Sequence, residues 1–97
     1  MAKGIEWSER ARNELFKILY YWTKRNKSKT YSEKLNGLIL EAIELVADAP
    51  ETGVPTKYTN VSIKIVRDYF VYYSIQQELI EVLTIWDSRR NPKKFKL

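Results

Sequence analysis

The fold is decided by residues 61–86, which read VSIKIVRDYFVYYSIQQELIEVLTIW. Apolar and polar residues alternate at the start of this stretch, and a period of two predicts a strand with one solvent-exposed face. Aromatic and β-branched residues dominate its middle and its end, which is typical of strands. Three strands are therefore expected, over residues 61–65, 69–75 and 79–86. The connections between them are only a few residues long, so we expect an antiparallel meander.

Two helices are predicted upstream of the meander. Ser8 has the position of an N-cap, and apolar residues then recur at helical spacing over residues 9–24. Thr30 and Glu33 have the spacing of a capping box and predict the start of a second helix. Pro50 ends that helix, because the residue before a proline disfavours the helical conformation. Since the connection between the helices is short, we expect an antiparallel helical hairpin.

The predicted fold class is α+β. Residues 5–7 have the pattern of a short first strand, which gives the element order β-α-α-β-β-β. We expect an antiparallel sheet with the helical hairpin packed on one face, in a single domain over residues 1–97. If Val61, Ile63 and Ile65 face the helices, Lys64 points toward the opposite, exposed face of the sheet.

The composition excludes several classes of active site. The chain has 97 residues and contains no cysteine and no histidine. Zinc sites built on thiolates or imidazoles, cysteine nucleophiles and Ser-His-Asp triads are therefore excluded. With only three glycines, the chain has no glycine-rich phosphate loop. We expect no metal and no cofactor, and any acid–base chemistry must use Lys, Arg, Tyr, Asp or Glu.

The sequence also gives an expectation about location. No apolar run approaches the roughly 20 residues that a membrane helix needs. Residues 1–6, MAKGIE, lack the apolar stretch of a signal peptide. The absence of cysteine agrees with a reducing compartment. We therefore expect a cytoplasmic protein without membrane contact.

The last ten residues carry the excess positive charge of the chain. They contain no acidic side chain and five basic ones, which are Arg89, Arg90, Lys93, Lys94 and Lys96. The net charge of the whole chain is +5, so the other residues sum to zero. Adjacent arginines at the end of a strand suit phosphate binding, because guanidinium groups match the geometry of phosphate oxygens.

Structural interpretations compete with phosphate binding. A basic tail can serve solubility alone. Arg89 can form a surface ion pair with Asp87 or Glu81. Strand tyrosines can stack on nucleobases, but alternation along a strand predicts that at least half of them belong to the core. The tyrosines concerned are Tyr69, Tyr72 and Tyr73.

The order of elements and several motifs resemble the RelE/ParE superfamily of toxins from bacterial type II toxin–antitoxin systems. The resemblance covers nearly the whole chain. It is carried by the opening IEWSERA at residues 5–11, the PETG loop at residues 50–53, the strand at residues 69–73 and the ending LTIWDSRRNP at residues 83–92. The resemblance implies the α+β fold predicted above.

The resemblance implies one of two activities. RelE-like members cleave mRNA in the ribosomal A site without a metal, through attack of the 2′-hydroxyl on the neighbouring phosphate. ParE-like members instead inhibit DNA gyrase. Members of both kinds are silenced by a cognate antitoxin, which we expect to mask the basic surface of this chain.

Positions carried over from RelE-like enzymes give three candidate catalytic residues. Arg89 matches the arginine at the end of the last strand, Lys64 falls near a lysine of the first meander strand, and Arg67 is the guanidinium nearest to the central strand. RelE-like enzymes carry an arginine where this chain has Phe70, and some carry a C-terminal tyrosine where it has Phe95. The expected RNA contacts are Lys57, Arg90, Lys93, Lys94 and Lys96.

The resemblance and the composition together leave three functions open, in this order. The first is a ribosome-dependent mRNA endonuclease that inhibits translation. The second is a ParE-type gyrase inhibitor without catalysis of its own, which the missing central-strand arginine and the lack of histidine make competitive with the first. The third is a non-toxic, basic RNA-binding domain. The expected partners are a cognate antitoxin and, as the target, either the ribosome with its mRNA or DNA gyrase.

Overall fold

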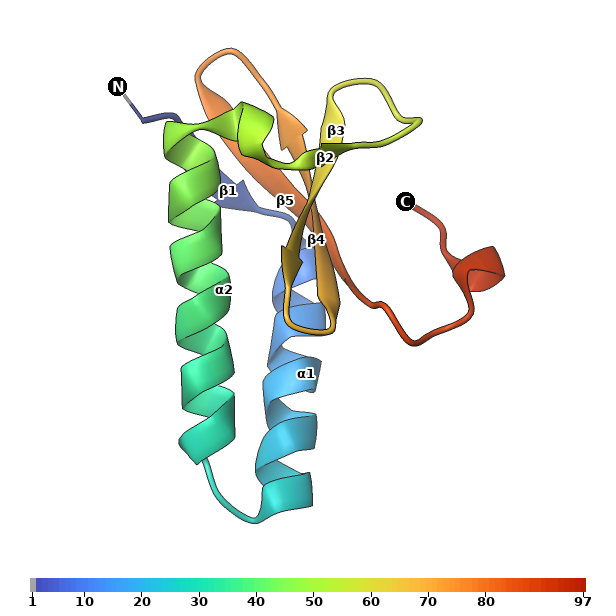
Figure 1. Cartoon of the computed structure of the whole chain (residues 1–97). Helices are drawn as coiled ribbons and strands as arrows, with labels where there is room; N and C mark the ends of the chain where they lie inside the picture. The colour runs from blue at the N-terminus through green and yellow to red at the C-terminus, as the bar shows by residue number, and fades with distance from the viewer. Residues whose placement is uncertain (1) are drawn as a thin grey trace.

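The computed structural model describes residues 2–97 (Figure 1). The helices are α1 (Glu9–Asn26) and α2 (Thr30–Asp48), and the strands are β1 (Gly4–Trp7), β2 (Val54–Pro55), β3 (Val61–Val66), β4 (Tyr69–Ile75) and β5 (Leu79–Asp87). Two 3-10 helices, η1 (Pro50–Thr52) and η2 (Pro92–Lys94), follow α2 and β5. No helix among the described residues is long and apolar enough to cross a membrane.

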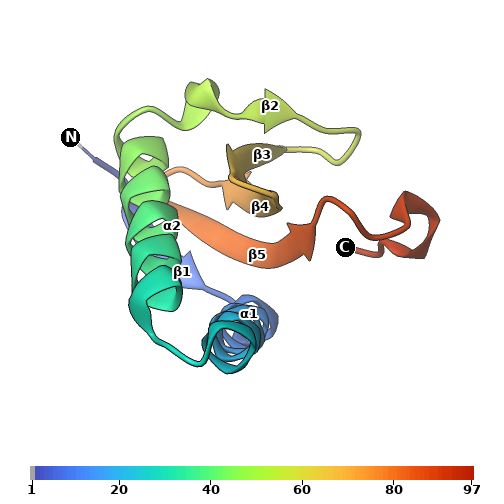
Figure 2. The same cartoon turned by 60° about the horizontal axis from the view of Figure 1, so that its bottom comes forward.

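The five strands form one sheet in the order β1-β5-β4-β3-β2, and both helices pack on the same face of it (Figure 2). β3, β4 and β5 form the predicted antiparallel meander. β1, however, pairs in parallel with β5, so the sheet is mixed rather than antiparallel. A tight turn fixes the relative direction of consecutive strands, but the helical hairpin and most of the meander separate β1 from β5.

β2 is an edge strand that the sequence does not predict. The sequence predicts a loop over residues 50–60, yet Val54 and Pro55 pair with Ile63 and Ser62 of β3. Proline has no N–H to donate, and this restricts it to the edges of sheets. β2 is therefore short because its own sequence cannot extend the ladder.

Ser8 caps α1 as predicted. Its Oγ accepts a hydrogen bond from the Ala11 N–H at 3.0 Å. The same hydroxyl donates to the Leu83 carbonyl of β5 at 2.9 Å, so the cap also attaches the helix to the sheet. α1 continues past the expected end at residue 24 and stops where Lys27 adopts a left-handed conformation, with φ of 50°.

The predicted capping box at the start of α2 is wrong. Thr30 already lies inside α2, the N-cap position is Lys29, and no side chain caps the helix there. Ser28 instead accepts a hydrogen bond from the Thr30 N–H through its Oγ at 3.2 Å, because the tight connection after α1 brings that hydroxyl over the first turn. At its other end α2 stops at Asp48, before Pro50, as predicted.

The core lies between the helices and one face of the sheet. Alternate residues of β4, namely Tyr69, Val71 and Tyr73, are at most 3% exposed. They pack with buried aliphatic residues of α2 and β5, which are Leu35, Ile39, Ile43, Val46, Ile80 and Val82. Burial of each large aliphatic side chain contributes about 1.5–3 kcal/mol, so this face supplies most of the hydrophobic stabilisation.

The strand register places Lys64 on the face opposite to the one predicted. Directly opposed residues of antiparallel strands share a face, and Lys64 is opposite Val71 of the core. Lys64 therefore lies on the helix-covered face, where it is partly exposed. Ile65 lies opposite Phe70 on the other face and is 56% exposed. Alternation within β3 does not tell which set of residues faces the helices, because the pairing with β4 decides it.

Candidate functional site

The face of the sheet away from the helices is aromatic. Phe70 of β4 is opposite Trp86 of β5, and Tyr72 is opposite Ile63 of β3, so these four side chains share this face. No helix covers them, yet Trp86 is only 6% exposed. Another segment of the chain must therefore cover this face.

That segment is the basic tail, residues 88–97. After β5 the chain passes through η2 and turns back toward the sheet (Figure 2). The Phe95 ring stacks on Tyr72 with centroids 4.5 Å apart and meets Trp86 edge-on at 5.1 Å. The Arg90 guanidinium lies over the same indole, 4.3 Å from its centroid. Aromatic and cation–π contacts therefore attach the tail to the sheet.

A cavity of about 490 Å³ lies between the tail and the loop before β3, and we call it the tail cavity. Five aromatic residues line it, which are Tyr58, Phe70, Tyr72, Trp86 and Phe95. Two cations, Lys57 and Arg90, complete its walls, and none of the lining residues is acidic. Aromatic rings together with cations are typical of surfaces that bind single-stranded nucleic acid.

Arg89 does not line the tail cavity but a separate pocket between α1 and the end of β5. Its Nε and Nη2 atoms donate to the two carboxylate oxygens of Asp87 at 3.0 and 2.9 Å. These hydrogen bonds hold the pKa of the Asp87 carboxyl below its ordinary value and raise the pKa of Arg89. Arg89 thus forms the ion pair that the sequence offers as the alternative to phosphate binding, although its side chain remains 55% exposed.

The three predicted catalytic residues do not line one common pocket. Lys64 is on the helix-covered face. Arg67 occupies the turn between β3 and β4, with φ of 56°, and lines a pocket with Leu38 of α2. Arg89 lines the pocket between α1 and the end of β5. Of the predicted RNA contacts, Lys57 and Arg90 line the tail cavity, and the lysines at 93, 94 and 96 are exposed on the tail.

The buried tyrosines offer little acid–base chemistry. Burial raises the pKa of Tyr69, Tyr72 and Tyr73, so all three are neutral phenols at neutral pH. Tyr69 Oη accepts a hydrogen bond from Trp22 Nε1 at 2.8 Å, and Tyr73 Oη donates to the Pro50 carbonyl at 2.7 Å. Tyr69 and Tyr73 therefore belong to the core, and Tyr72 alone of the three faces the tail cavity.

Glu14 makes contacts that the sequence does not predict. The spacing of the apolar residues puts it on the opposite, polar face of α1. In the structure its Oε1 accepts hydrogen bonds from the Thr84 hydroxyl at 2.5 Å and from the Ile85 N–H at 3.1 Å. Its Oε2 lies 3.5 Å from Arg10 Nε. Glu14 therefore connects α1 to the half of β5 that β1 does not reach.

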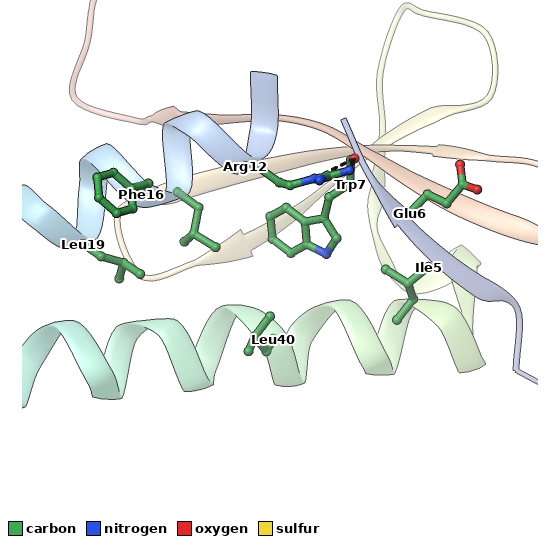
Figure 3. Close-up of a pocket in the computed structure, with 8 residues that line it drawn as sticks. Ile5, Glu6, Trp7, Arg12, Phe16, Leu19 and Leu40 are labelled. Carbon is green, nitrogen blue, oxygen red and sulfur yellow. Dashed lines mark hydrogen bonds between the residues drawn. The ribbon is translucent and has the colours of Figure 1, made fainter. Parts of the chain in front are cut away.

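A further surface, which we call the hairpin groove, lies between α1, α2 and β1 (Figure 3). Its volume is about 770 Å³, and it is lined by Ile5, Glu6, Trp7, Arg12, Leu15, Phe16, Leu19 and Leu40. Phe16 on one wall is 71% exposed, and Leu40 on the other is 42% exposed. The only sequence signal for this groove is an aromatic residue, Phe16, outside the apolar stripe of α1.

Comparison with known families identifies the chain. A family model described as the ParE toxin of the type II toxin–antitoxin system, parDE, matches residues 5–92. The chain belongs to the ParE toxin family. It is thus a toxin of a type II toxin–antitoxin system, which confirms the superfamily that its motifs resemble and implies a cognate antitoxin.

Solved structures agree with the fold of this ParE toxin. A chain from the structure titled "Chromosomal ParDE TA system from P. aeruginosa" matches it with a TM-score of 0.71 and 15% sequence identity. The match covers 87% of this chain and 94% of that chain. At this identity the likeness establishes the fold, and it confirms the predicted α+β class. A search of curated protein sequences gives no match.

Proposed function

We propose that this ParE toxin inhibits DNA gyrase by binding to it and does not cleave mRNA. The observation that carries the proposal is that Lys64 lies on the helix-covered face of the sheet, while Arg67 and Arg89 line two different pockets. Cleavage through a 2′-hydroxyl needs a proton acceptor and charge-stabilising donors within hydrogen-bond reach of one phosphate. No such set is assembled from the predicted residues. A binding inhibitor requires only a complementary surface.

We assign the basic tail to the contact with the target. Its cations are exposed, and the contacts of Phe95 and Arg90 hold it against the sheet. A surface with five cations and no acidic residue accelerates encounters with acidic partners, and such encounters weaken as salt rises. DNA gyrase is an intracellular target, which agrees with the expected cytoplasmic location of the toxin.

Assays with purified gyrase and with translating ribosomes separate the two activities. We expect the chain to inhibit plasmid supercoiling by gyrase and to leave ribosome-bound mRNA intact. The double substitution Lys93→Glu, Lys94→Glu should weaken inhibition at least about tenfold, because it reverses two charges of the tail. The matched control Lys27→Glu, Lys29→Glu makes the same change in the connection between the helices and should have little effect. Cleaved mRNA together with unaffected supercoiling would overturn the proposal.

The tail cavity supports a second candidate function, which is RNA binding followed by cleavage at the ribosome. Its cations Lys57 and Arg90 and its ring Tyr72 suit a phosphate and a stacked base. In this case Lys57→Ala and Arg90→Ala should reduce mRNA cleavage while leaving the thermal midpoint nearly unchanged. Pulse-labelling of cells that express the chain distinguishes the candidates, since loss of protein synthesis indicates the ribosome and filamentation indicates gyrase.

We also propose that the cognate antitoxin covers the basic tail with an acidic segment. The tail holds the whole net charge of the chain, so an acidic segment gains most by binding there. Co-expression with the product of the neighbouring reading frame, followed by pull-down at rising salt, tests this. If antitoxin binding changes neither with salt nor with the double substitution Lys93→Glu, Lys94→Glu, the antitoxin binds elsewhere on the toxin.

A further inference from the structure

The two helices that border the hairpin groove carry opposite charges. α1 contains five basic and two acidic residues, a net charge of +3, whereas α2 contains one basic and four acidic residues, a net charge of −3. Between them lies the apolar floor of the groove, which includes Trp7, Leu15 and Leu19. An apolar centre with charged edges has the anatomy of a protein–protein interface.

The α1 wall is an aromatic stripe that ends in a cation. Phe16, Tyr20 and Lys24 follow one another at intervals of four, so they share one face of the helix. The rings of Phe16 and Tyr20 are 71% and 57% exposed. The Lys24 ammonium lies 5.8 Å from the centroid of the Tyr20 ring. Two exposed rings beside an apolar groove form a larger patch than single exposed side chains normally do.

The α2 wall offers the complement of this stripe. Glu33, Gly37 and Leu40 follow one another at helical spacing along it. A Cβ atom added at Gly37 would meet nothing within 4 Å, so this position is open space that a ring can enter. The hydroxyls of Thr23 and Ser32 are 2.6 Å apart, which places Lys24 and Glu33 at the same level of the hairpin.

We propose that a second copy of this chain occupies the hairpin groove when the toxin is free of its antitoxin, with α1 of each copy on α2 of the other. A two-fold axis parallel to the helices produces this arrangement and repeats every contact twice. The Phe16 and Tyr20 rings of one copy then cover Leu40 and the open space at Gly37 of its partner. Lys24 of each copy meets Glu33 of the other.

Charge favours a second copy over an acidic peptide as the occupant. An acidic peptide is attracted by the net positive charge of α1 but repelled by the net negative charge of α2, and the basic tail offers it a better site. A second copy places its negative α2 on the positive α1 and its positive α1 on the negative α2. Its helices are already formed before binding, so no folding entropy is lost on association.

The size of the surface predicts a weak dimer. Helices of 18 and 19 residues are about 27 Å long, and two of them side by side present roughly 500 Å². Two copies then bury roughly 1,000 Å² in total, which is the lower limit of specific interfaces. We therefore expect a dissociation constant of about 10 μM, and a toxin that is monomeric at low cellular concentration.

Sedimentation of the full chain between about 1 and 200 μM tests the proposal across the expected dissociation constant. We expect a monomer–dimer equilibrium that weakens as salt rises. Phe16→Glu should raise the dissociation constant at least about 100-fold, because it places a carboxylate in the apolar centre. Leu45→Glu is the matched control, since Leu45 is 60% exposed on the side of α2 that borders Ile65 and should leave the dimer intact.

A charge exchange tests the predicted pairing directly. Lys24→Glu alone and Glu33→Lys alone should each weaken self-association about tenfold, because each creates two like-charged pairs. An equimolar mixture of the two variants should form heterodimers of wild-type strength, because both pairs become attractive again. A chain that stays monomeric at 200 μM (about twenty times the expected constant) overturns the proposal. So does a mixture that is no stronger than either variant. If Phe16→Glu abolishes antitoxin binding while the wild-type chain shows no dimer, the groove belongs to the antitoxin.

Discussion

The two faces of the sheet are covered in different ways. On one face, two long helices bury Tyr69, Val71 and Tyr73 almost completely. On the other, a ten-residue tail covers Tyr72 and Trp86 chiefly through the single ring of Phe95. The backbone N–H groups of residues 90, 94 and 95 bind only carbonyls three residues earlier, so they do not attach the tail to the sheet.

This difference separates stability from binding. The helix-covered face can open only when the whole domain unfolds, because its contacts join distant parts of the chain. The tail can leave its face at the loss of a few contacts, and it leaves a cavity beside Lys57 and Arg90 even when it is in place. We therefore expect substitutions on the first face to affect folding and those on the second face to affect function.

The largest effect should come from the helix-covered face. Ile80 is fully buried, and Ile80→Ala should lower the free energy of unfolding by about 2–5 kcal/mol through lost burial and a cavity. Ile65→Ala removes the same atoms from a residue that is 56% exposed and should change stability by less than about 0.5 kcal/mol. Urea denaturation measures both. Equal losses for the two variants would contradict the assignment of the core to one face.

A smaller loss is expected where the loop before β2 meets the core. A Cβ atom at Gly53 would lie 2.0 Å from Tyr73 Oη and 2.9 Å from the Ile63 carbonyl oxygen. Gly53→Ala should therefore destabilise the fold by about 1–3 kcal/mol, because Tyr73 must move and lose its bond to Pro50. In a Tyr73→Phe background the same substitution should cost less. An additive double-mutant cycle would show that the two residues do not interact.

The contacts of the tail should contribute less to the free energy of unfolding than the residues tested by Ile80→Ala or Gly53→Ala. Phe95→Ala removes one stacked and one edge-on ring contact and should cost about 1 kcal/mol. It should also shift the fluorescence of Trp86 toward that of an exposed indole and speed trypsin cleavage after Arg90. Phe95→Leu keeps an apolar side chain and should preserve most of the protection. If Phe95→Ala destabilises the chain as much as Ile80→Ala, the tail is part of the core and the contrast between the faces disappears.

The smallest effect should be the pH dependence of the ion pair at the end of β5. Because the hydrogen bonds from Arg89 lower the pKa of Asp87 in the folded state, the pair stabilises the fold above the ordinary carboxyl pKa. That contribution is lost as the pH falls and Asp87 becomes protonated. Asp87→Asn should thus lower the thermal midpoint slightly at neutral pH and not at strongly acidic pH. Arg89→Ala should remove the same pH dependence, and a constant gap between Asp87→Asn and wild type at every pH would contradict the assignment.

Local patterns were sufficient to predict most elements of the fold. The Ser8 cap, the helical stripes, the stop before Pro50 and the meander all depend on residues close in sequence. The parallel pairing of β1 with β5 was not predictable in this way, because no turn joins them. The face of Lys64 was predicted wrongly for a related reason, since it depends on the register with β4 rather than on β3 itself.

The candidate site was less predictable than the fold. Composition located the positive charge correctly, and Lys57 and Arg90 do line one cavity. It did not predict that Phe95 returns to Tyr72, because that contact follows an irregular segment. The pairing of Arg89 with Asp87 is a contact between near neighbours, and the sequence left it open as an alternative. Two interpretations of one arginine differ only in side-chain geometry, which periodicity does not encode.

The carboxylate of Glu14 protects the free part of the β5 edge from pairing with strands of other chains. β1 ends opposite Val82, and a strand edge with free N–H and carbonyl groups is a template on which strands of other chains assemble into aggregates. Glu14 binds the Ile85 N–H, and Ser8 binds the carbonyls of Val82 and Leu83. The first turns of α1 therefore seal that edge. Strands of other chains therefore cannot pair with this part of β5, whether or not the antitoxin is bound.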